Sequence, residues 1–123
     1  TMDKVRGPIT KIEYGQDNDN IYISFESKEP NFCRLYEMEI LLEPINKKIR
    51  MFFDDIAKSC DGIEIRSVCK NLLEISIDKR DIDVDEISLR FEVIKDSRVI
   101  QTLPGFGELK LDLGNDYAQN WFI

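Results

Sequence analysis

The chain has 123 residues, of which 42% are hydrophobic and 33% charged, and this composition suits a single compact globular domain over residues 1–123. There are 17 Lys and Arg residues against 24 Asp and Glu, a net charge of −7, and no His. The absence of His excludes Ser-His-Asp and Cys-His catalysis and the HExxH zinc helix. No apolar run resembles a signal peptide or a membrane span, so we expect a cytoplasmic protein.

The chain has three cysteines, Cys33, Cys60 and Cys69, which are widely spaced and form no CxxC motif. An odd number at such spacing makes a poor disulfide framework and a poor zinc site. We therefore expect reduced, mostly buried thiols, as is usual in the cytoplasm.

The first half of the chain begins with strand patterns. Residues 10–14 are predicted to form a short first strand, and residues 15–20 are rich in Gly, Asn and Asp, which favour turns. Apolar and polar residues then alternate over 21–26 and again over 36–43, with Tyr36 on the apolar face and Tyr22 on the polar face. This period of two predicts strands with one buried and one wet face.

The segment 44–60 predicts the one helix of the chain. Apolar residues recur there at steps of three and four, which makes a single apolar stripe; they are Ile45, Ile49, Phe52, Phe53, Ile56, Ala57 and Cys60. Pro44 suits a first helical turn and Gly62 suits a C-cap.

The second half returns to strand patterns, with alternation over 63–66, 73–77, 87–93 and 109–113 and a further strand over 98–103. Turns are expected at 70–71, 96–97 and 104–107, and a charged loop over 78–86. The last residues, 115–123, contain Tyr117, Trp121 and Phe122, which either close the core or add an aromatic anchor to a binding surface.

These elements predict an α+β fold. Short strands joined by tight turns pair antiparallel, and one helix cannot cover seven or eight strands, so the sheet must curl or split. We expect a curled antiparallel sheet (half-barrel or sandwich-like) of seven to eight strands with one amphipathic helix packed on its concave face.

Acidic residues are densest over 74–92, which holds seven acids and three bases. Such a patch can attract a basic partner and speed its docking, or it can simply be a solvated loop. The partner-binding residues expected on the first hypothesis are Asp78, Asp81, Asp83, Asp85, Glu86 and Tyr22.

A calcium site is a poor match. Asp81, Asp83 and Asp85 fit the first ligand positions of an EF-hand loop and Glu92 fits the twelfth, but Glu86 stands where the loop needs Gly. Asp17 and Asp19 match the spacing of calcium ligands over a still shorter stretch.

A phosphate-binding loop is also a poor match, because the Gly105–Gly107 segment is too short and lacks the Lys of such a loop. We expect neither a metal nor a cofactor.

The leading functional hypothesis is a non-catalytic protein-binding module, an immunity protein or antitoxin that covers the active site of a basic toxin such as a nuclease. Net acidity disfavours nucleic acid and anionic membranes as partners. The alternatives are an accessory or adaptor domain, with self-association through a sheet edge, and a carboxylate-dependent enzyme, which needs at least two buried acids with raised pKa in a pocket.

Overall fold

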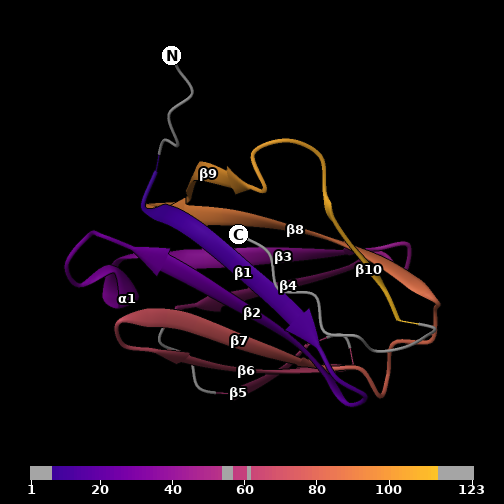
Figure 1. Ribbon diagram of the computed structural model, residues 1–123. Coiled ribbons are helices and arrows are strands. Elements are labelled where there is room, and N and C mark those ends of the chain that lie inside the picture. The colour runs from indigo at the N-terminus through magenta and orange to yellow at the C-terminus, as the bar shows by residue number, and fades with distance from the viewer. Residues whose placement is uncertain (1–6, 54–56, 61, 114–123) are drawn as a thin grey trace.

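Two antiparallel sheets packed face to face make up the part of the protein that the structure describes (Figure 1). The computed structural model describes residues 7–53, 57–60 and 62–113. The first sheet has the order β1 (Ile9–Gln16), β2 (Asn20–Ser27), β7 (Leu72–Asp78), β6 (Ile63–Cys69) and β5 (Ala57–Cys60). The second has the order β10 (Leu109–Asp112), β8 (Glu86–Lys95), β3 (Glu37–Glu43) and β4 (Lys47–Phe52), and β9 (Arg98–Leu103) pairs with the remaining length of β8.

Alternation of apolar and polar residues determines which face of each strand is buried. In β2 the side chains of Ile21, Ile23 and Phe25 are buried and their neighbours are half-buried. Phe25 meets Phe91 of β8 edge to face, with ring centroids 5.1 Å apart, so this pair joins the two sheets. The core therefore lies between the sheets and draws on both of them.

The expected antiparallel pairing is confirmed, and the strands form two open sheets, which is the divided arrangement that the sequence left open beside a single curled sheet. The described residues form ten strands, more than the seven or eight expected. The turns expected at 70–71, 96–97 and 104–107 are found. Asp96 and Ser97 both have positive φ, 53° and 65°, the combination that matches the twist of a tight hairpin.

The prediction of a helix over residues 44–60 is wrong. Residues 44–46 form a turn, in which Asn46 has φ of 56°, and β4 and β5 follow. Ile49, Met51 and Phe53 are buried while Phe52 between them is 55% exposed, so burial follows a period of two. The described helix, α1 (Phe32–Leu35), is a single turn and does not cover a sheet. No helix in residues 7–53, 57–60 or 62–113 has the length and hydrophobicity needed to cross a bilayer.

The expectation of reduced thiols is also wrong for two of the three cysteines. Cys33 in α1 and Cys69 at the end of β6 form a disulfide, 36 residues apart in sequence. The bond ties the α1 segment to the β6–β7 hairpin, a contact between distant segments that cysteine spacing alone does not reveal.

Replacing both bonded cysteines by Ser should destabilise the protein by about 3–4 kcal/mol, because a closed loop of this length restricts the unfolded chain. Urea unfolding monitored by fluorescence measures this loss. Thiol alkylation before and after reduction gives an independent check: two additional cysteines should react only after reduction. Equal labelling in both conditions would contradict the disulfide.

Two buried glutamines connect the sheets on the side where β1 faces β9 and β10. Gln101 of β9 accepts a hydrogen bond from Ile9 N (2.9 Å) and donates one to Ile9 O (2.8 Å). Gln16, at the other end of β1, donates from Nε2 to Asp112 O (2.9 Å). Gly7 makes room for the first contact, since a Cβ there would lie 2.6 Å from the Gln101 side chain. The two amides thus join both ends of β1 to the second sheet.

Gln101→Leu should lower the free energy of unfolding by about 2–4 kcal/mol, because it leaves the buried N–H and C=O of Ile9 without partners. Chemical denaturation measures the change. Thr102→Val is the matched control, since Thr102 is the next residue of β9 and lies on its opposite face. Equal effects of the two substitutions would contradict this role for Gln101.

Candidate binding surface

The charged loop between β7 and β8, residues 79–85, is anchored by apolar side chains. Ile82 is buried, and Val84 packs against the core. The alternate residues Asp81, Asp83 and Asp85 are exposed. The backbone is also held, because Ile82 N donates to Lys79 O (3.0 Å) and Leu113 N donates to Asp85 O (2.7 Å). The loop thus presents three carboxylates on a fixed backbone.

The β1–β2 hairpin tip lies beside this loop and adds further carboxylates. Lys79 N donates to Asp19 O (2.9 Å), which joins the two segments. The end of β10 reaches the same place, since Asp112 pairs with Glu86. We call this end of the molecule the acidic end; its carboxylates belong to Asp17, Asp19, Asp78, Asp81, Asp83, Asp85, Glu86 and Asp112.

The two basic residues of the acidic end are engaged with their neighbours. Lys79 Nζ donates to Gln16 Oε1 and to Asp17 O, both at 2.8 Å, and burial lowers the pKa of this lysine. Arg80 pairs with Asp78, Nη2 to Oδ2 at 2.7 Å. The pairing reduces what Asp78 can offer to a partner, whereas the carboxylates of Asp81, Asp83 and Asp85 have no described ion pair.

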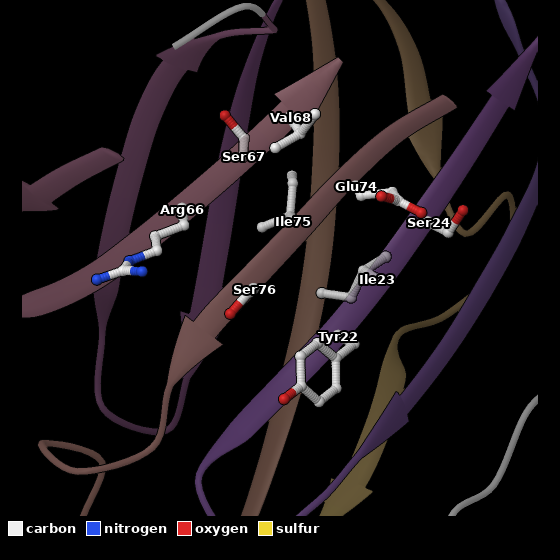
Figure 2. Close-up of a pocket in the computed structure, with 9 residues that line it drawn as sticks. All are labelled: Tyr22, Ile23, Ser24, Arg66, Ser67, Val68, Glu74, Ile75 and Ser76. Carbon is white, nitrogen blue, oxygen red and sulfur yellow. The ribbon is translucent and has the colours of Figure 1, made fainter. Parts of the chain in front are cut away.

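The outer face of the first sheet contains a hollow of about 370 Å³ across β2, β7 and β6 (Figure 2). Strand register places Ser76 of β7 opposite Tyr22 of β2 on one side and opposite Arg66 of β6 on the other. The next row places Glu74 between Ser24 and Val68. The serines are small, so the surface dips between the larger side chains of Tyr22, Arg66 and Val68.

This hollow continues to the acidic end. Arg66 and Ser76 also line an adjoining depression together with Asn20, Glu64, Asp78 and Arg80. A third depression, around Asn18, Asp19, Asn20 and Lys79, follows it. We call the three together the outer groove; it contains side chains of both charges, with acidic groups at the end nearest the β1–β2 hairpin.

Tyr22 connects the outer groove with the acidic end. Its hydroxyl donates to Asp17 Oδ2 at 2.8 Å, which holds the ring in place. That bond, together with the backbone N–H groups of Asn20 and Asp19, lowers the pKa of Asp17, and the same bond raises the pKa of Tyr22. A half-buried aromatic ring of fixed orientation therefore lies beside carboxylates.

The structure places the predicted site residues in three positions. Tyr22 and Asp78 line the outer groove. Asp81, Asp83 and Asp85 lie on the anchored loop, and Glu86 begins β8 in the second sheet. The groove residues Arg66, Glu74 and Ser76 were not predicted from the sequence, because only strand register brings them together. Their polar positions in alternating strands were a signal that they face water, but not that they line one groove.

Few polar side chains are buried among the described residues. The buried polar side chains among them are Gln16, Ser67 and Gln101, and no described carboxyl group is buried. No three His, Cys, Asp or Glu residues in residues 7–53, 57–60 and 62–113 converge in a way that could hold a metal ion. The residues Tyr117, Trp121 and Phe122, for which the sequence left two roles open, lie outside the described part of the chain.

Comparisons with known proteins give no match: no protein-family model fits the chain, and neither a curated protein nor a solved structure is significantly similar to it. The acidic end and the outer groove are therefore the features that bear on function.

Tyr22→Phe should raise the pKa of Asp17 toward its ordinary value of 3.8, because the substitution removes the hydrogen bond that lowers it most. Folding lowers this pKa, so the Asp17 carboxylate adds stability at pH values above 3.8, and the contribution is lost as the pH falls through the lower folded value. The variant should lose less stability on acidification than the wild type does. Carbon-detected NMR titration measures the pKa; an unchanged value in the variant would contradict the assignment.

Proposed function

We propose that this protein is a non-catalytic binding module that neutralises a basic protein partner, as an immunity protein or antitoxin does when it covers the active site of a toxin. The observation that carries the proposal is the anchored loop 79–85, which presents Asp81, Asp83 and Asp85 to solvent beside the hairpin tip that bears Asp17 and Asp19. A toxin that cleaves nucleic acid has a basic active site, because it must hold phosphates. An acidic end of this kind complements such a site.

Charge arrangement supports a role in partner capture. Lys79 points its ammonium group into the hairpin and Arg80 is paired, so neither opposes a cationic partner as strongly as an unpaired base would. The negative electrostatic field of such an acidic surface raises the association rate with a cationic partner, and added salt weakens this effect. Tyr22 and the outer groove beside it supply a place where a partner side chain could be buried, and Tyr is favoured at such positions.

Replacing Asp81, Asp83 and Asp85 by Asn should slow association with a basic partner about tenfold or more at low salt, because the field that steers the encounter is weakened. The probe is the product of the gene adjacent to the one encoding this chain, if it is a basic nuclease, in a catalytically inactive form. Surface plasmon resonance at several salt concentrations measures the rates.

The matched control removes three carboxylates elsewhere: Glu39→Gln and Glu92→Gln, which face each other across β3 and β8, and Glu108→Gln before β10. Its overall charge change is the same, so a local surface effect should spare it. Binding that does not depend on salt, or equal slowing by both triple variants, would contradict the proposal.

The adaptor alternative differs in one measurable respect, because it predicts that partner binding is unaffected by the Asn substitutions. The carboxylate-dependent enzyme remains an alternative as well. It would need acids with raised pKa, whereas the resolved shifts of carboxyl groups in the described residues, those of Asp17 and Asp78, are downward.

A further inference from the structure

The outer edge of β1 is one of the sheet edges with which no described strand pairs, and its two ends are held in place by glutamine side chains. Among the described residues β1 pairs with β2 alone. At one end the Gln101 side chain hydrogen-bonds the backbone N–H and C=O of Ile9. At the other end the Gln16 side chain donates to Asp112 O of β10. Between them, a mainly apolar groove separates β1 from the second sheet. Its lining includes Ile12, Leu103, Pro104 and Leu109, together with Lys11. Such an edge is a template for another strand.

The direction of the backbone groups follows from the hairpin. Asp17 N donates to Asn20 O, and hydrogen-bonded pairs alternate along an antiparallel ladder. Counting back by twos, Gly15, Glu13 and Lys11 face β2, so Ile12 directs its N–H and C=O toward the open side. Ile12 lies opposite Phe25, on the core face, whereas Lys11 and Glu13 lie opposite Glu26 and Ser24 on the outer face.

We propose that β1 pairs antiparallel with β1 of a second copy of this chain, with Ile12 on the two-fold axis. In that register Ile12 exchanges two backbone hydrogen bonds with its copy. Lys11 of each chain faces Glu13 of the other on the outer face, which makes two cross-strand pairs of opposite charge. Registers centred on Glu13 or Lys11 would place like charges directly opposite each other. Neither Lys11 nor Glu13 belongs to a described ion pair.

The antiparallel arrangement also suits the overall charge. β1 runs toward the acidic end, so a two-fold axis at Ile12 directs the two acidic ends away from each other. Asp17 lies five positions along the strand from Ile12, roughly 17 Å, which is longer than the screening distance of about 8 Å at physiological salt. The dimer would join two five-stranded sheets into one continuous sheet and leave both outer grooves exposed. This proposal is independent of the function proposed above.

Sedimentation equilibrium of the full chain and its charge variants tests the proposal. The wild type should dimerise reversibly, and Lys11→Glu and Glu13→Lys should each raise the dimer dissociation constant about tenfold or more, because each places like charges opposite each other. The double variant restores opposite charges and should return within about threefold of the wild type. Lys70→Glu, an exposed change of the same charge at the β6–β7 turn, should have little effect.

Three sedimentation results would overturn the proposal: a wild type that stays monomeric at a few hundred micromolar, a double variant that does not recover, or a loss of dimer in Lys70→Glu equal to that in Lys11→Glu. Circular dichroism confirms that each variant is folded. Hydrogen exchange at the Ile12 amide adds a second readout, since protection should rise with protein concentration. Protection in a monomer would assign this edge to another segment of the same chain and would also overturn the proposal.

Discussion

The fold depends on one constraint: each sheet must bury one face against the other while its opposite face meets water. Side chains alternate across a strand, so this constraint fixes the register of every pairing, and a slip by one residue would expose the core face. Phe25 and Phe91, in contact across the two sheets, mark the centre of that buried layer. The outer groove is a product of the same constraint, because side chains that turn away from the core in β2, β7 and β6, such as Tyr22, Ser76 and Arg66, form its walls and floor.

Much of the strand layout could be predicted from the sequence, since alternation is a local signal and Asp96-Ser97 or Lys70-Asn71 mark turns directly. The segment 44–60 was misassigned because Ile45, Ile49, Phe52 and Phe53 fit a helical stripe, while Ile49, Met51 and Phe53 fit a strand. The strand forms because it buries the alternate side chains of Ile49, Met51 and Phe53 in the core. Exposure of Asp81, Asp83 and Asp85 was predictable, but the groove was not, since Tyr22, Ser76 and Arg66 meet only through long-range pairing.

Charge at the acidic end is organised by its few basic groups. The Lys79 ammonium group donates hydrogen bonds to the hairpin tip, and burial lowers the pKa of this lysine. Arg80 forms an ion pair with Asp78. The exposed carboxylates of Asp81, Asp83 and Asp85 have no ion pair among the described residues. The Cys33–Cys69 disulfide adds a separate consideration, because disulfides persist mainly in oxidising compartments. It gives no support to the cytoplasmic location expected from composition, which stays a prediction.

The inward side chains of Ile82 and Val84 have a consequence for the thermodynamics of complex formation. A segment that must become ordered when it binds loses conformational entropy, and that loss subtracts from affinity. Here the backbone between Lys79 and Asp85 is already ordered by the hydrophobic core before any encounter. Recognition could therefore proceed with little rearrangement of this segment, and a cationic surface would meet carboxylates whose spacing is set in advance.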